Sequence, residues 1–375
     1  MQQPLIQTTG SGLTPASAGG VIEAARAITA SSLAPLTTRI DLEGLYPEAV
    51  MRELGAAGVF GAHLPSIHGG QGDLAAAIEA MGAISHECLS TGFLTWCQDT
   101  CAWYIENSEN ESLRREWLPE VAAARRLGGT GLSNPMKAFS GIEPLRLTAK
   151  PVSGGYVVNG ALPWVSNLGA DHVFGTVFRV EGDQPRHVMA LIDCTSEGFT
   201  LRNCGPFTAL EGTRTLSCGF KDVFVPESMV IADPVEPYLQ RVRAGFILLQ
   251  MGMGIGNAQA CIDLMNAVEP QLGHVNAFLD DRPDELQEQL DDALEATRAL
   301  AEDPSNTDPG YWREVLELRL AAAELVLRAA HSAMLHTGAK GYLQQGAAQR
   351  KLREAYFVAI VTPAIKHLRK ELSQL

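Results

Sequence analysis

The chain has 375 residues, of which 46% are hydrophobic and 19% charged, so its composition is that of a folded globular protein. This length is enough for two or three domains with cores of their own. The formal net charge of −14 repels the phosphates of nucleic acids, so we expect no nucleic-acid partner. No run approaches the roughly 20 consecutive apolar residues of a membrane span, so we also expect no membrane partner.

The N-terminal segment and the cysteines predict a cytoplasmic protein. Residues 1–20 are polar and lack the basic and apolar regions of a signal peptide. The 7 cysteines include no C-x-x-C pair, as expected in a reducing compartment. Cys97 and Cys101 are four residues apart on a predicted helix, and we interpret them as small buried residues. The sequence therefore predicts no metal site.

Helical periodicity covers the first third of the chain, from about residue 19 to residue 124. Pro47 lies near the start of one helical segment, where its fixed φ and missing N–H are tolerated. The run Gly69-Gly70-Gln71-Gly72 predicts a loop between two helices. We therefore predict an N-terminal helical domain over residues 1–127.

Short alternating segments separated by turn residues occupy residues 145–230. Ser153-Gly154-Gly155 predicts a hairpin turn, and Asn159-Gly160 predicts a second turn. The connections between the segments are too short for crossover helices, so the sequence predicts an antiparallel sheet. Residues 128–235 form the predicted β domain.

Helical periodicity returns after Pro237 and continues to the C-terminus. The predicted helices cover residues 242–268, 283–301, 311–335 and 345–372. Long helices joined by short loops predict a four-helix bundle over residues 236–375. The predicted fold class is therefore α+β, with a helical domain, an antiparallel β domain and a helical bundle in that order.

One glycine-rich run lies inside the first of these helices. Gly252-Met253-Gly254-Ile255-Gly256 lacks the G-x-G-x-x-G spacing of a nucleotide-binding loop and follows no predicted strand. We interpret its glycines as positions where two helices pack closely.

A series of short motifs spans nearly the whole chain in a fixed order. They are Leu54-Gly55-Ala56-Ala57-Gly58-Val59, Trp117-Leu118-Pro119-Glu120-Val121, Thr130-Gly131-Leu132-Ser133-Asn134-Pro135, Tyr156-Val157-Val158-Asn159-Gly160, Trp164-Val165-Ser166-Asn167 and Val223-Phe224-Val225-Pro226. In order and spacing this series resembles the acyl-CoA dehydrogenase superfamily. The resemblance implies the fold predicted above and a flavin-dependent oxidoreductase.

The resemblance also implies a set of cofactor-binding residues, with FAD as the expected cofactor. Leu132 and Ser133 would bind the pyrimidine edge of the flavin, Trp164 would flank its ring system, and Ser166 would lie near N5. Such a ring needs an apolar wall and polar partners at its edge. The alternatives are a core aromatic role for Trp164 and a turn role for Ser166.

The chain departs from the family at both positions that hold the carboxylate base in dehydrogenases. The resemblance places Thr362 at one of these positions and Phe246 at the other, where both would line the substrate cavity. Neither side chain abstracts a proton near neutral pH, so the catalytic residue is not identified. Glu211 and Asp99 are unplaced carboxylates, which we interpret as solvated or capping residues.

The segments that hold the cofactor tail in the family also differ here. Gly273-His274-Val275-Asn276-Ala277-Phe278-Leu279 lacks the expected arginine, and Gly338-Ala339-Lys340-Gly341 has one glycine of the G-G-x-G motif replaced. These changes leave open FAD held by different contacts, the smaller FMN, or weak binding of a reduced flavin.

Three functions follow from the resemblance and its departures. The first is a divergent acyl-CoA dehydrogenase-like oxidoreductase acting on an acyl thioester or a related small organic molecule, with an electron-transfer flavoprotein as its partner. The second is a monooxygenase that takes reduced flavin from a flavin reductase and needs no carboxylate base. The third is a family subunit that has lost catalysis. The family also implies a homodimer or homotetramer assembled through the C-terminal helices.

Overall fold

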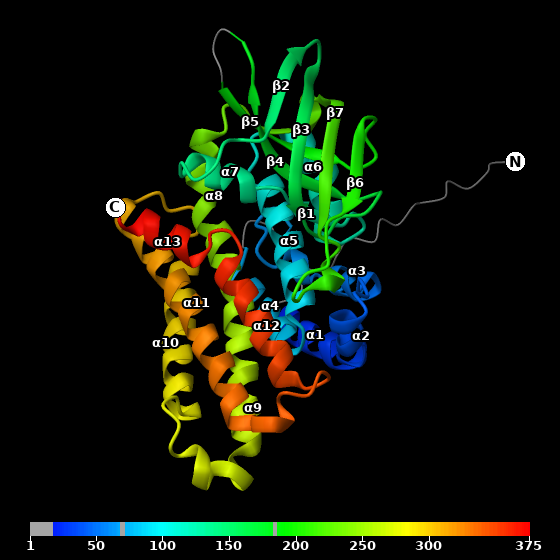
Figure 1. The fold of residues 1–375 in the computed structure, drawn as a ribbon. Coiled ribbons are helices and arrows are strands. Elements are labelled where there is room, and N and C mark those ends of the chain that lie inside the picture. The colour runs from blue at the N-terminus through cyan, green and yellow to red at the C-terminus, as the bar shows by residue number, and fades with distance from the viewer. Residues whose placement is uncertain (1–17, 68–71, 183–185) are drawn as a thin grey trace, which may run out of the picture.

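The computed structural model describes residues 18–67, 72–182 and 186–375. A β-sheet lies at one end of the molecule, long helices extend from it, and the N-terminal helices pack beside both (Figure 1). Gly69, Gly70 and Gln71 lie outside the described residues, so the loop predicted there stays a prediction.

The N-terminal region is helical, as predicted. Its α-helices are α1 (Ala18–Ile28), α2 (Thr37–Leu42), α3 (Glu48–Ala56), α4 (Leu74–Glu87), α5 (Leu89–Glu106) and α6 (Glu111–Ala122). Short π and 3-10 turns are η1 (Thr29–Leu33), η2 (Ala34–Leu36) and η3 (Val59–Gly61). Pro47 is the N-cap of α3, so its missing N–H removes no helical hydrogen bond. Helix α5 is buried on all sides, and it contacts helices from both ends of the chain as well as the sheet.

One 8-stranded sheet follows. Its strands are β1 (Gly128–Thr130), β2 (Leu147–Val152), β3 (Gly155–Val165), β4 (Val173–Val180), β5 (Arg186–Asp193), β6 (Phe199–Asn203), β7 (Leu216–Pro226) and β8 (Val230–Ala232), with helix α7 (Ser133–Phe139) and the 3-10 turns η4 (Glu211–Thr213) and η5 (Glu227–Met229) between them. The order in the sheet is β6-β7-β3-β2-β4-β5-β8, and β1 pairs with β4.

The prediction of a purely antiparallel sheet was wrong for two ladders. Strand β4 runs parallel to both β1 and β2, whereas the other ladders are antiparallel. The prediction considered only strands that follow each other in sequence. In the sequence, β3 comes between β2 and β4 and reverses the direction of the chain. Strands β2 and β4 therefore run in the same direction without a crossover helix.

The hairpin turn at Ser153 and Gly154 is confirmed, because β2 pairs with β3 across it. The second turn, predicted at Asn159-Gly160, was wrong, since β3 continues through both residues. The ladder with β7 shifts its register there, and Gly160 has a φ of +131°. Glycine therefore provides a β-bulge at this point and not a chain reversal.

The C-terminal region contains the predicted bundle. Its helices are α8 (Glu236–Leu249), α9 (Met251–Asn276), α10 (Pro283–Ala301), α11 (Pro309–Thr337), η6 (Gly338–Lys340), α12 (Ala347–Ile360) and α13 (Ile365–Leu372). Helices α9, α10 and α11 pack on one another, and α12 packs on α9 and α11 (Figure 1). The division of the chain into domains at residues 127 and 235 stays a prediction.

The single helix predicted over residues 242–268 is interrupted at Gln250. The N–H of Gln250 donates to the Ile247 carbonyl, and the N–H of Met253 donates to the Gln250 carbonyl, so tighter three-residue turns replace the α-helical pattern. Residues Glu236–Asn276 together are long and apolar enough to cross a membrane by length and composition, but 94% of their most apolar window is buried within the protein. We interpret the stretch as a pair of core helices.

The glycine run of α9 packs closely on another helix, as predicted, but this helix is α4 of the N-terminal region and not a helix of the predicted bundle. A Cβ on Gly256 would overlap the carbonyl oxygen of Gly82 and lie 2.8 Å from the Cβ of Ser85. A Cβ on Gly252 would lie 2.7 Å from the Ile78 carbonyl oxygen. The backbones of α4 and α9 therefore approach more closely than any residue with a Cβ atom would allow at these two positions.

Replacing Gly256 by alanine is expected to lower the free energy of unfolding by about 1–3 kcal/mol, because the new methyl group overpacks the contact with α4. Gly254 is the matched control, since its Cβ would meet only ordinary contacts at 3.7 Å and beyond. Gly254→Ala is expected to be neutral or stabilising by up to about 1 kcal/mol, from helix propensity alone. Chemical denaturation of both variants measures the difference, and equal losses would contradict close packing at Gly256.

Candidate functional site

The segment that contains Leu132 and Ser133 is fixed between the sheet and helix α5. Strand β1 precedes it and pairs with β4, and the N–H of Gly131 donates to the Gly175 carbonyl. The Tyr104 hydroxyl on α5 lies 2.7 Å from the Thr130 hydroxyl. Leu132 is buried, and Ser133 begins α7.

Ser133 and Thr362, which are far apart in sequence, meet in the structure. Their hydroxyl oxygens lie 2.9 Å apart, and Thr362 belongs to the short segment between α12 and α13. Two hydroxyls carry two hydrogens, and their mutual hydrogen bond uses only one. The pair therefore keeps one hydrogen and several lone pairs for a bound molecule.

Trp164 and Ser166 lie at the end of β3 and just beyond it. Trp164 is 55% exposed, so the alternative of a core aromatic was wrong. The Ser166 and Thr215 hydroxyl oxygens lie 2.6 Å apart, and Thr215 lies 2.8 Å from Thr213, which donates to the Leu210 carbonyl. Because each hydroxyl has one hydrogen, this order makes Ser166 donate to Thr215 and leaves Ser166 with lone pairs.

Phe246 lies in a buried aromatic cluster between α8 and α5. Its ring centroid is 5.1 Å from that of Trp96, edge to face, and 6.1 Å from that of Tyr104. The Trp96 ring stacks on Phe93 at 5.6 Å, and Phe93 meets Phe357 of α12 at 4.5 Å. The cluster forms an apolar wall one helical turn before Gln250, whose side-chain amide donates to the Thr362 carbonyl at 2.9 Å. Gln250 therefore connects the helix that carries Phe246 to Thr362.

The two unplaced carboxylates have different environments. Glu211 accepts a hydrogen bond from the N–H of Phe207 in the loop before η4, so it makes a local loop contact and does not cap a helix. The interpretation of Asp99 as solvated or capping was wrong, because Asp99 is 1% exposed on α5. Its carboxylate lies 4.0 Å from Nδ1 of the buried His63, and burial raises its pKa well above the ordinary value. The α5 side chains that contact the Phe246 ring are Trp96 and Tyr104, whereas the Asp99 carboxylate faces His63.

Cys97 and Cys101 are both buried thiols, which confirms their interpretation as small core residues. Burial raises the pKa of the Cys101 thiol to about 12, so it is a poor metal ligand and a poor nucleophile at neutral pH.

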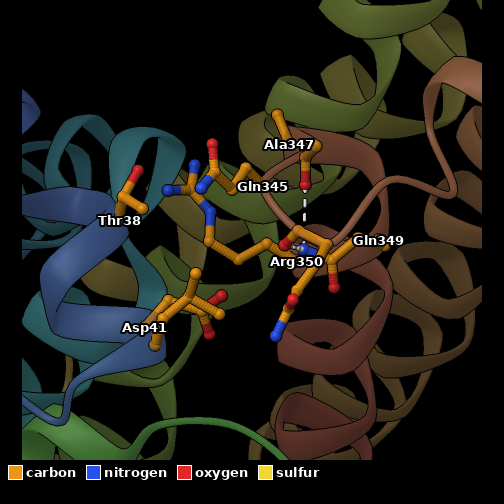
Figure 2. Close-up of a pocket in the computed structure, with 9 residues that line it drawn as sticks. Thr38, Asp41, Gln345, Ala347, Gln349 and Arg350 are labelled. Carbon is orange, nitrogen blue, oxygen red and sulfur yellow. Dashed lines mark hydrogen bonds between the residues drawn. The ribbon is translucent and has the colours of Figure 1, made fainter.

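A small pocket lies between α2 and the segment that leads into α12 (Figure 2). It encloses about 50 Å³ and is lined by polar side chains, among them Asp41, Gln345 and Arg350. The altered glycine motif, residues 338–341, lies just before this segment. None of the site residues predicted from the sequence lines the pocket.

The C-terminal helix α13 is attached to the end of α7, the helix that begins at Ser133. His367 Nε2 lies 2.7 Å from the Ser140 hydroxyl and 2.9 Å from Glu371 Oε1, and Ser140 donates to the same carboxylate oxygen at 2.6 Å. Burial favours the neutral form of Glu371. The hydrogen bonds from His367 and Ser140 and the positive charge of Arg243 outweigh this effect, so the Glu371 pKa lies below its ordinary value.

Three residues at the site were missed by sequence reasoning. Gln250 and Arg319 are buried polar side chains within apolar helical runs, and Tyr104 connects α5 to Thr130. The isolated polar residue in Ile247-Leu248-Leu249-Gln250-Met251 was the available signal, because a polar group in a core needs a specific partner.

The fold has counterparts among known proteins. Residues 20–125 match the family model described as "Acyl-CoA dehydrogenase, N-terminal domain". The human mitochondrial short-chain specific acyl-CoA dehydrogenase is 25% identical over 357 residues, which cover 91% of this chain and 85% of the human protein.

Solved structures agree in fold at lower identity. Butyryl-CoA dehydrogenase from Megasphaera elsdenii superposes with a TM-score of 0.84 at 18% identity, over 95% of this chain and 97% of its own. Dibenzothiophene monooxygenase (TdsC) from Paenibacillus sp. A11-2 has a TM-score of 0.78 at 16% identity, over 94% of this chain and 96% of its own. The fold is thus shared by dehydrogenases and a monooxygenase. The N-terminal region of this chain matches the acyl-CoA dehydrogenase N-terminal domain, and the whole chain is similar to acyl-CoA dehydrogenases in sequence and fold.

Replacing Glu371 by glutamine is expected to reduce the pH dependence of stability. Because the folded state lowers the pKa of Glu371, its stabilising contribution is present above the ordinary glutamate value of about 4.3 and is lost as the pH falls through the lower folded value. We expect Glu371→Gln to be less stable than the wild type by about 1 kcal/mol near neutral pH. The gap should narrow in acid. Denaturation at several pH values measures this, and a gap that stays constant down to about pH 3 would contradict the ionic contribution.

Proposed function

We propose that the protein is a flavin-dependent oxidoreductase of the acyl-CoA dehydrogenase type. The observation that carries this proposal is the contact at 2.9 Å between the hydroxyls of Ser133 and Thr362. It joins a residue proposed to bind the flavin edge to a residue proposed to bind the substrate.

The residues present fit a flavin. Trp164 offers a large exposed apolar face, and two hydroxyl pairs, Ser133 with Thr362 and Ser166 with Thr215, offer polar atoms for its edge. A Cβ on Gly129 would overlap the Ser166 carbonyl oxygen, so the backbone of strand β1 lies directly against the residue that follows β3. FAD is the proposed cofactor, with FMN as the alternative.

The roles of the protein's residues follow from these contacts. Bound flavin supplies the transfer of electrons to or from the substrate. Ser133 and Leu132 would hold its pyrimidine edge, Trp164 would cover one face, and Ser166 would lie near N5, where its lone pairs could accept a hydrogen bond from a reduced flavin. Phe246 and its aromatic neighbours exclude water from the side of the cavity that receives the substrate.

A monooxygenase reaction is the second candidate, favoured by the side chains at the two base positions. Thr362 presents a hydroxyl and Phe246 an apolar ring, so neither supplies a carboxylate for proton abstraction. The similar fold of TdsC, which has also been solved with FMN and indole, supports this candidate. A flavin reductase is then the proposed partner, and an electron-transfer flavoprotein is the partner for dehydrogenation.

The absorbance spectrum of the purified protein tests the proposal, together with identification of any cofactor released on denaturation. Bound oxidised flavin that bleaches with an acyl-CoA in the absence of oxygen would support dehydrogenation. A colourless protein that binds reduced flavin, and gives an oxygen-dependent transient absorbance, would support the monooxygenase. No binding of flavin in either redox state would overturn both, and leave a subunit without catalysis.

Thr362→Val provides the matched test of the hydroxyl contact. The loss of one hydrogen bond is expected to weaken flavin or substrate binding roughly five- to tenfold. Thr200→Val on the edge strand β6 removes an exposed hydroxyl elsewhere and should leave binding unchanged. If both variants bind alike, the contact has no part in binding.

We propose that the protein assembles as a homodimer or homotetramer in the cytoplasm. Large apolar side chains are exposed at the far end of the bundle, with Phe278 87% and Tyr342 81% accessible. Large apolar side chains with this degree of exposure are candidates for burial at an interface. Light scattering is expected to give twice or four times the monomer mass, and a monomer would contradict the proposal.

A further inference from the structure

Arg319 of helix α11 is a buried cation in the centre of the bundle. Its side chain is 1% exposed, and it forms no ion pair with any residue that the structure describes. Burial lowers its pKa to about 10, so it stays charged at neutral pH. Burying an unpaired charge is unfavourable, and an apolar side chain would fill the same volume without that penalty. The position therefore calls for an explanation beyond packing.

The hydrogen bonds of Arg319 lead towards Thr362. Its Nε donates to Gln250 Oε1 at 2.8 Å, and its Nη2 donates to the Val358 carbonyl at 2.7 Å. Val358 lies in the last turn of α12, whose carbonyls lack helical partners and carry the negative end of the helix dipole. Arg319 thus holds both the end of α12 and the side chain of Gln250.

Gln250 carries this constraint to the segment beyond α12. A guanidinium only donates hydrogen bonds, so the oxygen of the Gln250 amide must face Arg319 and its nitrogen must face the other way. That nitrogen donates to the Thr362 carbonyl at 2.9 Å. Gln250 lies at the interruption between α8 and α9, and it is 1% exposed. The amide therefore has one orientation, and Thr362 is the residue it fixes.

The series of contacts ends at the hydroxyl pair. Thr362 is held through its carbonyl by Gln250, and its hydroxyl lies 2.9 Å from that of Ser133. Helices α8 and α9, which follow one another end to end, and α11 and α12, which pack on α9, contribute to this arrangement (Figure 1). We infer that Gln250 and Arg319 are positioning residues that hold the Thr362 hydroxyl in the flavin and substrate site, an inference that rests on the proposed function.

Gln250→Glu is the most direct test, because it keeps the shape of the side chain. The new carboxylate still accepts from Arg319 and forms an ion pair, but it has no hydrogen to donate to the Thr362 carbonyl. We expect the variant to stay folded and to bind FAD or FMN roughly tenfold more weakly, with a shifted absorbance band of the bound flavin.

Gln289→Glu is the matched control. Gln289 on α10 also accepts from an arginine of α11, since Arg328 Nη1 donates to it at 2.8 Å, and it also donates to a backbone carbonyl, that of Glu285. It is exposed and belongs to no part of the site. Flavin binding by this variant should equal that of the wild type.

A double variant separates positioning from general stability. If Gln250 acts through Thr362, then adding Gln250→Glu to Thr362→Val should weaken flavin binding no further than Thr362→Val alone. An effect that persists in the Thr362→Val background would overturn the inference, as would a folded Gln250→Glu protein with wild-type affinity and spectrum.

If the Gln250→Glu protein fails to fold, Arg319→Lys tests the positioning role instead. Lysine keeps the charge but loses the two-pronged hydrogen bonding to Gln250 and Val358. We expect weaker flavin binding than in the wild type, and unchanged binding by a folded Arg319→Lys protein would overturn the inference. Failure of the wild type itself to bind FAD or FMN would instead refute the proposed function, and the positioning role with it.

Discussion

The complete burial of helix α5 is the constraint on which the candidate site depends. Gln98 is fully buried at its centre and binds four groups from three other segments. Its amide nitrogen donates to the carbonyls of Val121 and Arg126, and its oxygen accepts from the N–H of Gly128 and from Asn167. One side chain thereby connects α6, the first strand and the residue after Ser166. A buried amide with all its hydrogen bonds formed permits few alternative arrangements.

Other side chains of α5 extend this connection to strand β1 and to the C-terminal helices. Tyr104 binds Thr130 ahead of the Leu132 and Ser133 segment, and Trp96 donates to the Phe246 carbonyl at 3.4 Å. The flavin-binding residues proposed in the β domain and the substrate-binding residues proposed in the bundle therefore share one rigid support. Sites built on buried regular elements hold their side chains more accurately than sites built on loops.

Polar groups inside the bundle distinguish this chain from a simple apolar core. Arg319 and Gln250 occupy positions where hydrophobic side chains would pack without loss, yet each makes specific hydrogen bonds to backbone carbonyls. Together with the uncharged side chains of Thr362 and Phe246, they give the region a hydroxyl and an amide, and neither of the two positions carries a carboxylate.

The sequence by itself determined the order of helical, β and helical regions, the hairpin at Ser153 and Gly154, and the close approach of helices at Gly256. These features depend on periodicity, turn residues and side-chain size, which are local properties. The parallel pairing of β4, the interruption at Gln250 and the burial of Asp99 were decided by the tertiary structure alone. Each depends on which distant segment lies opposite, and no local pattern encodes that. The same reason explains the site, because motif positions proposed Ser133 and Thr362 separately, and only the contacts of α13 and the segment before it with α7 and Ser140 brought their hydroxyls together.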